Sequence, residues 1–226
     1  MKIIELGEID STNEYCKRRG KENLIVAAVS QTSGKGTKGR SYVSDEGGLY
    51  LSVMRHYDNF LSCNAFKIMV NACVAVCRTV QSFGLKPVIR WANDVLVNGK
   101  KICGTLIENT FSGSYISRSI VGMGINVNNK LPYELKNIAT SLSAELGKPV
   151  DIKAVRSELV KNLQKDYTIK DYKNFINWFG KEVTVKTERG ELTAIAVDVD
   201  YDGGLLCVIA GSVNKINSAE VSLRLK

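Results

Sequence analysis

The segment 90–104 brings a carboxylate and an ammonium group together. Short apolar runs flank Asn98-Gly99, the dipeptide typical of a two-residue hairpin turn with both residues at positive φ. In the register of such a hairpin, Asp94, Lys101 and Cys103 lie on one side of the ribbon. Asp94 is then the diagonal neighbour of Lys101, about 7–8 Å away and without a tight ion pair. This arrangement suits a site for a charged substrate, and an exposed cross-strand ion pair of little energetic weight is the alternative.

A loop rich in glycine and cations is the second candidate. Three glycines and three cations occur within Gly34–Arg40, after an apolar strand at 24–29 and before another at 47–53. Glycine lets backbone N–H groups approach a phosphate closely, and lysine or arginine neutralises its charge. The spacing differs from that of the P-loop. The pattern predicts an anion-binding loop that its ligand orders, and a solvated flexible loop is the alternative.

Two further segments, one of small polar residues and one with two glycines, are candidates for ligand contact. Ser11-Thr12-Asn13 begins a short helix at 12–19, either as a helix cap or as a cluster of hydrogen-bonding groups for a polar head group. Gly122 and Gly124 lie near the end of a strand. Two glycines there permit close approach of a ligand or of another backbone, and a bulge is the alternative.

Hydrophobic periodicity predicts a scaffold of mixed α and β structure for these candidates. It predicts a long core helix at 63–83, a helix capped by Asp151, and a short helix at 172–179. The remaining strands of the first part are expected at 3–6, 88–91, 102–111 and 115–121. Five short strands follow, at 183–185, 192–199, 205–209, 213–216 and 221–225. These five predict a small SH3-like β-barrel, and hence two domains, at 1–179 and 180–226.

Composition excludes several classes of protein. The chain has 226 residues and a net charge of +8, from 31 Lys and Arg against 23 Asp and Glu. This basic balance favours acidic partners, which could be nucleotide phosphates, nucleic acid or an acidic protein. Its six cysteines form no Cys-x-x-Cys pair, and its single histidine, His56, excludes a multi-histidine metal site. No apolar run approaches the ~18–20 residues of a membrane span, and the N-terminus lacks the apolar segment of a signal peptide. We therefore expect a cytoplasmic protein with reduced cysteines.

In this order and spacing, four segments together resemble the motifs of the biotin protein ligases: Ser11-Thr12-Asn13, Gly34–Arg40, 90–104 and Gly122–Asn128. The resemblance covers almost the whole chain, including the small C-terminal barrel. It implies an α+β fold whose mixed sheet is related to the catalytic domains of class II aminoacyl-tRNA synthetases. The chain is similar to the short members, which lack the N-terminal DNA-binding repressor domain, so DNA is not an expected partner.

The resemblance also implies an activity in two steps. Biotin and MgATP would form biotinyl-5′-AMP and pyrophosphate, and the biotinyl group would then pass to one lysine of the biotin carboxyl carrier domain of a carboxylase. ATP, Mg²⁺ and biotin are thus the expected small molecules, with Mg²⁺ held mainly by the ATP phosphates. No membrane partner is implied, and either a monomer or a homodimer is expected.

Carried over position by position, the motifs of the family assign three groups of residues. The residues that bind biotin would be Ser11, Thr12, Asn13, Gln31, Lys35, Gly36, Thr37 and Lys101. The residues that bind ATP or the adenylate would be Gly34, Lys35, Arg40, Trp91, Asn93, Lys101 and Asn126. The catalytic residues would be Lys101 and Lys35, as cations beside the reacting anions, and Asp94, which would orient or deprotonate the acceptor lysine.

The loop departs from the usual pattern of the family, Gly-Arg-Gly-Arg-x-Gly-Arg. Lys35 and Thr37 replace the first two arginines, and threonine lacks the charge and the reach of arginine. We therefore expect the adenylate to escape faster than it does from an arginine-bearing relative. Ala92 replaces the proline of the usual Lys-Trp-Pro-Asn-Asp, which costs loop stiffness but leaves Asn93 and Asp94 in place.

Two alternative functions stay open at this point. A lipoate protein ligase shares the adenylate chemistry, although Trp91-x-Asn93-Asp94 and Gly124–Asn128 favour biotin. A basic nucleic-acid-binding module of another class would interleave aromatic and basic residues on one surface. Aromatic residues are only 8% of this chain and are not clustered with the cations. ATP-dependent covalent transfer separates both ligases from the binding module.

Overall fold

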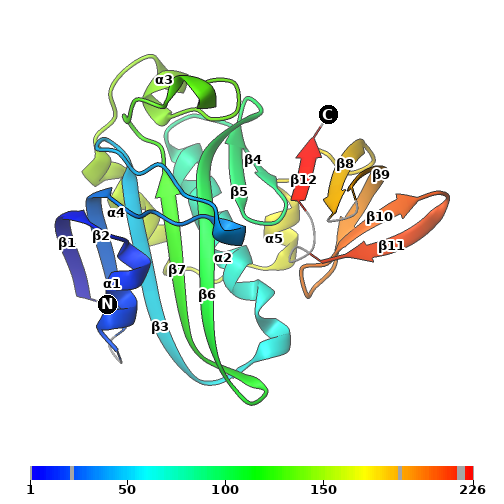
Figure 1. Cartoon of the computed structure of the whole chain (residues 1–226), viewed down its shortest axis with the longest axis horizontal. Coiled ribbons are helices and arrows are strands. Elements are labelled where there is room, and N and C mark those ends of the chain that lie inside the picture. Colours follow the sequence, from blue (N-terminus) through cyan, green and yellow to red (C-terminus); the bar gives the residue numbers. More distant parts are fainter. Residues whose placement is uncertain (1, 21–22, 188–189, 218–221, 226) are drawn as a thin grey trace.

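A mixed sheet of seven strands forms the larger part of the fold (Figure 1). The computed structural model describes residues 2–20, 23–187, 190–217 and 222–225. The strand order is β1-β2-β3-β7-β6-β5-β4, with β1 parallel to β2 and all other neighbours antiparallel. The strands are β1 (Lys2–Ile9), β2 (Leu24–Gln31), β3 (Leu49–Leu61), β4 (Pro87–Arg90), β5 (Asp94–Val97), β6 (Lys100–Ser112) and β7 (Tyr115–Ile125). The predicted α+β class with a mixed sheet is confirmed.

Two helices cover opposite faces of this sheet. α1 (Thr12–Arg18) packs on one face, where Leu24 and Val26 of β2 form a small apolar cluster with Cys16. α2 (Phe66–Ser82) covers the other face, where Ile25 belongs to the main hydrophobic cluster. Successive strand residues point to opposite faces, so β2 is apolar at consecutive positions because both of its faces are buried. The start of α1 therefore lies on the face away from α2.

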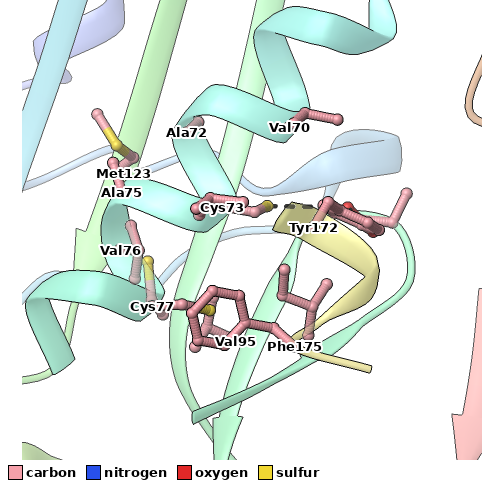
Figure 2. Packing of buried hydrophobic residues seen from close by; sticks show 14 of the residues in the cluster. Val70, Ala72, Cys73, Ala75, Val76, Cys77, Val95, Met123, Tyr172 and Phe175 are labelled. Atoms are coloured by element: carbon pink, nitrogen blue, oxygen red, sulfur yellow. Dashed lines mark hydrogen bonds between the residues drawn. The ribbon is translucent and has the colours of Figure 1, made fainter. Parts of the chain in front are cut away.

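The helix α2 is the long core helix expected at 63–83. It begins at Phe66, after a 3₁₀ turn at Ser62–Asn64, and Gly84 follows it with φ 85°, a left-handed conformation typical of the residue that ends a helix. Its buried face includes Cys73 and Cys77, which pack near Val95, Tyr172 and Phe175 (Figure 2). The prediction of this helix is correct apart from its first turn.

The apolar character of this helix also bears on the expectation about membranes. By length and mean hydropathy (1.3) alone, Ser62–Ser82 could cross a membrane, although Lys67, Asn71 and Arg78 interrupt its apolar residues. Most of its most apolar stretch is nevertheless buried inside the fold, where it packs against the sheet. A buried core helix passes the same test of length and composition as a membrane span, and here its apolar side chains have protein partners.

Three further helices follow the sheet strands in the chain: α3 (Leu142–Leu146), α4 (Ile152–Asn162) and α5 (Ile169–Lys173). The short helix expected at 172–179 is therefore misplaced. α5 begins at Ile169 because Thr168 and Asp171 form a capping box there. Trp178 lies beyond the helix, buried, and its indole N–H donates to the carbonyl of Ile89 at 2.7 Å. The apolar residues after α5 thus fill the core instead of extending the helix.

The C-terminal strands form a second sheet of five strands, in the order β11-β10-β9-β8-β12, beside β4, β5 and α5 (Figure 1). They are β8 (Glu182–Thr187), β9 (Gly190–Val199), β10 (Leu205–Ile209), β11 (Ser212–Ile216) and β12 (Ser222–Leu225). All five predicted strands are present, although Val221, expected in the last one, lies outside the described residues. Val183 and Ala194 belong to the same hydrophobic cluster as Trp178, so the two sheets share a core. The domain boundary at residue 180 stays a prediction.

Candidate active site

A cavity of about 640 Å³ lies between the start of α1, the loop after β2, the β5–β6 hairpin and the end of β7. All but one of the predicted site residues line it: Ser11, Thr12, Asn13, Gln31, Lys35, Gly36, Thr37, Arg40, Trp91, Asn93, Asp94, Lys101 and Asn126. The exception is Gly34, which is buried against Ser44, where a Cβ would collide with the serine hydroxyl. Segments far apart in the sequence therefore meet around one space.

Hydrogen bonds tie the start of α1 to the neighbouring loop and sheet. Gln31 Oε1 accepts from the Thr12 N–H at 2.8 Å and from the Thr12 hydroxyl at 3.1 Å. Ser52 Oγ lies 2.7 Å from Thr12 Oγ1 and 2.6 Å from Asn13 Oδ1. Ser11 occupies the N-cap position, but its side chain makes no capping bond. The cluster is thus more than a helix cap, and it presents donors and acceptors at one end of the cavity.

Asn13 is fixed by residues that the sequence analysis did not single out. Its Nδ2 donates to Glu108 Oε2 of β6 at 2.8 Å, while its Oδ1 faces Ser52 of β3. Gly122 of β7 lies against it, and a Cβ there would collide with Asn13 Oδ1. Gly122 therefore makes room for a side chain of the protein itself. Glu108 and Ser52 stand in ordinary strand positions, so no local motif identifies them.

Tyr42 is a second residue that the sequence analysis missed. Its hydroxyl donates to the carbonyl of Gly124 at 2.7 Å, and a Cβ at Gly124 would collide with its ring. Lys101 Nζ lies 5.6 Å from the ring centroid, within the range of a cation–π contact. Burial raises the pKa of Tyr42 well above its ordinary value, so the phenol stays a protonated donor. Gly104 and Gly124 lie opposite each other on β6 and β7, and without side chains there they leave room for the Tyr42 ring to pack flat on the sheet. Glycines at these strand positions were the available sequence signal for such a close approach.

Asp94 forms ion pairs with two cations. Lys101 Nζ lies 2.6 Å from Asp94 Oδ1, and Arg90 Nη2 lies 2.6 Å from Asp94 Oδ2. The expected separation of Asp94 and Lys101 is therefore wrong, because the long lysine side chain crosses the diagonal between the strands. Burial by itself raises the pKa of Asp94, but Lys101 and Arg90 outweigh it, so the pKa is lowered. Asp94 is an anion near neutral pH, and its charge is matched twice.

The hairpin has the predicted turn but a different register beyond it. Asn98 and Gly99 have φ of 49° and 77°, which confirms the turn. Ile102 is an extra residue in β6, so Cys103 faces Val95 and the partner of Asp94 is Gly104. Cys103 lies in the main hydrophobic cluster, and its predicted position beside Asp94 is wrong. The cause is a β-bulge, which shifts the register by one residue.

Trp91, Asn93 and Asn126 shape the remaining wall. Asn93 Nδ2 donates to the Thr105 carbonyl at 2.9 Å, and the Thr105 N–H donates to the Asn93 carbonyl at 3.0 Å, which fixes the turn between β4 and β5. The Trp91 indole donates to the carbonyl of Gly203 at 2.9 Å and so joins this turn to the small sheet. Asn126 Nδ2 donates at 3.0 Å to the carbonyl of Thr140, which precedes α3. Their predicted contacts with an adenylate stay predictions.

Sequence comparison identifies the family. The profile of the biotin/lipoate A/B protein ligase family matches residues 7–126, more than half of the chain and nearly all of the residues that line the cavity. The chain belongs to this ligase family. A second profile, the C-terminal domain of biotin protein ligases, matches residues 179–224 of the ligase, the region of the small sheet.

Individual relatives agree with the family. The ligase is 30% identical over 229 residues to the bifunctional ligase/repressor BirA of Bacillus subtilis, a match that covers 94% of this chain and 70% of that protein. It is 31% identical over 132 residues to the biotin–[acetyl-CoA-carboxylase] ligase of Paracoccus denitrificans, 54% of this chain and 53% of that one. A biotin protein ligase from Aquifex aeolicus, solved in complex with biotin and ATP, superposes with a TM-score of 0.81 at 30% identity, over 100% of this chain and 99% of its own. The predicted resemblance is confirmed.

Positive charge dominates the cavity of this ligase. Among the described residues, five cations line it, Lys35, Lys38, Arg40, Arg90 and Lys101, against one carboxylate, Asp94. Such an excess favours the binding of two anionic groups in one place. The described part of the chain holds no group of three or more His, Cys, Asp or Glu side chains that suits a metal ion.

Proposed function

We propose that this ligase is a biotin protein ligase, which forms biotinyl-5′-AMP from biotin and ATP and passes the biotinyl group to a lysine of a biotin carboxyl carrier domain. One observation carries the proposal. A single cavity joins a buried cluster of hydroxyl and amide groups at the start of α1 to a set of cations. The relative from Aquifex aeolicus, solved with biotin and ATP, supports the proposal, as does the match to the C-terminal domain of biotin protein ligases.

The cluster at the start of α1 is assigned to the head group of biotin. The ureido group is neutral and has both N–H donors and a carbonyl acceptor, and Thr12, Asn13 and Gln31 offer both kinds of partner. Ser11, Thr12 and Asn13 are buried, so their hydrogen bonds form away from bulk water. A buried polar group that loses its partner is costly, which makes such a site selective for the matching head group.

Lys101 is assigned to the first step. A carboxylate oxygen of biotin attacks the α-phosphorus of ATP, the bond to the bridging oxygen breaks, and pyrophosphate leaves. Two anions must meet, so the main catalytic need is a fixed cation at the developing charge. Lys101 stands on a two-stranded hairpin and is held by Asp94 at 2.6 Å. Lys35 and Arg40 supply further cations from the loop.

Asp94 is assigned to positioning in the second step. The acceptor lysine attacks the acyl carbon as a neutral amine, and AMP leaves. A carboxylate with a lowered pKa is a weak base, so Asp94 is poorly suited to remove the proton of the lysine. By holding Lys101 and Arg90, it keeps two cations where the phosphate of the leaving AMP requires them.

The described residues that line the cavity do not fit a dedicated Mg²⁺ site. Asp94 is the one carboxylate that lines the cavity among the described residues, and both of its oxygens face cations. Mg²⁺ prefers carboxylate and phosphate oxygens with several waters. We therefore assign the ion to the ATP phosphates and name no protein ligand for it.

The acceptor is proposed from the chemistry and from one relative. The ligase of Paracoccus denitrificans is named for acetyl-CoA carboxylase, and a carboxylase carries biotin on a lysine of its carrier domain. A cytoplasmic location, the absence of a DNA or membrane partner, and a monomeric or homodimeric state stay predictions.

Isothermal calorimetry with biotin and with lipoate, each with and without a non-hydrolysable ATP analogue, tests the proposed function. We expect biotin to bind with a dissociation constant of about 1 μM or below, and more tightly when the nucleotide analogue is present. Binding of lipoate in its place would move the protein to the lipoate ligases of the same family. Binding of neither would contradict the proposal.

A further inference from the structure

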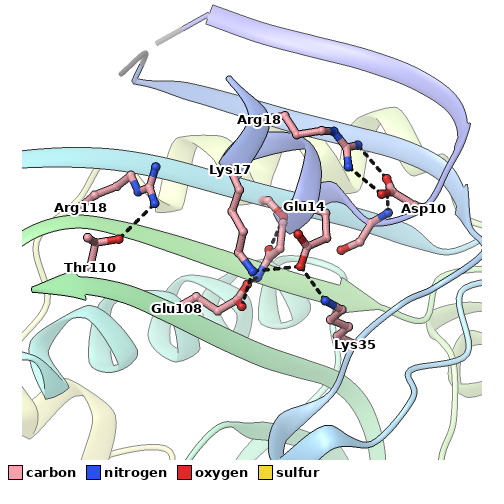
Figure 3. Close-up of polar contacts among 11 residues, drawn as sticks. Asp10, Glu14, Lys17, Arg18, Lys35, Glu108, Thr110 and Arg118 are labelled. Atoms are coloured by element: carbon pink, nitrogen blue, oxygen red, sulfur yellow. Dashed lines mark hydrogen bonds and ion pairs between the residues drawn. The ribbon is translucent and has the colours of Figure 1, made fainter. Parts of the chain in front are cut away.

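An ion pair joins the cation-rich loop to helix α1. Lys35 Nζ lies 2.6 Å from Glu14 Oε1, and Figure 3 shows the two side chains reaching toward each other from the loop and from the helix. Glu14 directly follows Asn13, which belongs to the cluster assigned to the biotin head group. Lys35 lines the cavity, whereas Glu14 does not. The ion pair therefore joins Lys35, in the wall of the cavity, to Glu14, which lies outside the cavity.

Glu14 is itself held in place by a chain of alternating charges. Its Oε1 also accepts from Lys17 Nζ at 2.9 Å, and Lys17 Nζ lies 2.7 Å from Glu108 Oε1 on β6 (Figure 3). The hydrogen bonds from Lys35 and Lys17 lower the pKa of Glu14, so it stays ionised. An isolated exposed ion pair contributes little, because two long side chains lose entropy to form it. Here Lys17 and Glu108 already restrict Glu14, so less entropy is lost when Lys35 binds.

Gly36, Thr37 and Arg40 bond to one another within the loop tip. Arg40 donates to Thr37 Oγ1 at 3.0 Å and to the Thr37 carbonyl at 3.1 Å, and the Gly36 N–H donates to the Arg40 carbonyl at 2.7 Å. Firm contacts with the sheet resume at Tyr42. Thr37 stands where the usual pattern of the family has an arginine. Lys35 thus links the segment 34–40 to helix α1 through its side chain.

From this geometry we infer that Glu14 is a positioning residue for adenylate retention: through Lys35 it holds the loop segment 34–40 over the cavity. That Glu14 holds the loop through Lys35 rests on the ion pair alone. That this hold retains the adenylate rests on the proposed function. Glu14 touches no reacting atom. It fixes Lys35, and the position of Lys35 sets how often the segment opens. A lid that opens more often releases a bound intermediate more often.

Limited trypsin digestion of the protein without ligands tests the mechanism alone. Cleavage after Lys38 reports opening of the loop, because a protease cuts the open form. We expect Glu14→Gln to speed this cleavage by about two- to fivefold, the range of an ion pair within a network. Arg18→Gln is the matched control. It breaks the ion pair between Arg18 of the same helix and Asp10, which precedes the helix (Figure 3). Neither residue belongs to the segment 34–40, so the cleavage rate should stay unchanged.

A double-mutant cycle separates the ion pair from a general effect on α1. If Glu14 acts through Lys35, the variant with both Glu14→Gln and Lys35→Gln is cleaved after Lys38 no faster than either single variant. Additive effects of the two substitutions would overturn the inference, and so would a wild-type cleavage rate in Glu14→Gln. Added salt should speed cleavage of the wild type and have less effect on Glu14→Gln, because salt screens the exposed pair.

The lifetime of enzyme-bound biotinyl-5′-AMP tests the consequence. The full chain is loaded with labelled biotin and MgATP, and loss of bound label is followed after a chase with unlabelled biotin. We expect Glu14→Gln to shorten the half-life by the same two- to fivefold, about the effect of one ion pair, with an unchanged rate of adenylate formation. An unchanged half-life would overturn the assigned role in retention. A wild type that forms no adenylate would overturn the proposed function, while the trypsin result still decides whether Glu14 holds the loop.

Discussion

The ammonium group of Lys101 lies 2.6 Å from the carboxylate of Asp94, across two strands whose register a β-bulge shifts by one residue. Gly104 stands opposite Asp94 because of that bulge, and a Cβ at Gly104 would collide with the end of the Lys101 side chain. The bulge therefore does two things. It sends Cys103 into the core, and it leaves room beside Asp94 for the cation.

Replacement of Lys101 tests its role in the first step. Lys101→Ala should lower biotin-dependent ATP–pyrophosphate exchange by a factor of ~10²–10³, the usual cost of removing a preorganised group that stabilises charge. Asp94 keeps its ion pair with Arg90 in this variant, so no buried carboxylate is left unpaired. Lys100→Ala is the control, because Lys100 lies on the same hairpin outside the cavity. Exchange within a few-fold of wild type would remove Lys101 from the mechanism.

Asp94→Asn tests the paired carboxylate through pH. The pKa of Asp94 is below its ordinary 3.8, so its ion pairs stabilise the folded state above about pH 4 and are lost as the pH falls through the lower folded-state value. At neutral pH the free energy of unfolding of the variant should be about 3–5 kcal/mol lower than that of the wild type. In urea titrations this difference should stay constant down to about pH 5 and shrink in more acidic solution. A difference that changed near neutral pH would point to another group.

The same variant also tests the second step. Asp94→Asn leaves Lys101 and Arg90 without their common anion, so both cations lose their fixed positions. We expect slower transfer from preformed biotinyl-5′-AMP to the acceptor domain in single-turnover measurements, at a pH where the variant is fully folded. Transfer at the wild-type rate would show that the positions of these cations do not depend on Asp94.

Gly122→Ala tests the orientation of Asn13. The added Cβ would collide with Asn13 Oδ1, so the amide must turn away from Ser52 or Glu108. We expect the affinity for biotin to fall about tenfold, or 1.4 kcal/mol, in calorimetric titrations of a variant that is still folded. Gly7→Ala is the control, because no atom lies within 4 Å of a Cβ built there. Wild-type affinity for biotin in Gly122→Ala would argue against Asn13 as a ligand of the head group.

Thr37→Arg tests the departure of the loop from the usual pattern of its family. The new cation can reach an adenylate phosphate from the loop tip, which threonine cannot. Biotinylation of lysines on an unrelated bystander protein should fall about threefold or more, the effect of one charged contact, relative to labelling of the acceptor. Thr37→Val, which removes only the hydroxyl that accepts from Arg40, separates added charge from loss of that bond. Equal bystander labelling in wild type and Thr37→Arg would refute the expectation of fast escape.

The sequence by itself determined the features that depend on neighbouring residues. Asn98-Gly99 specifies its turn because the dipeptide accepts positive φ at both positions. The apolar period of α2 and the five short C-terminal strands follow from patterns of a few residues, as does the cationic loop. The order of the motifs along the chain was enough to indicate the family, and hence which segments had to meet.

Only the tertiary structure decided which side chains touch. Ser52 and Glu108 lie on strands with no motif, and they reach Asn13 because β3, β7 and β6 are neighbours in the sheet. The register shift at Ile102 has no local signal, since a bulge depends on what both strands bury. The pair Glu14–Lys35 joins residues 21 positions apart. Distances between such groups depend on the packing of the whole sheet, and a local pattern specifies a period and a face but no distance.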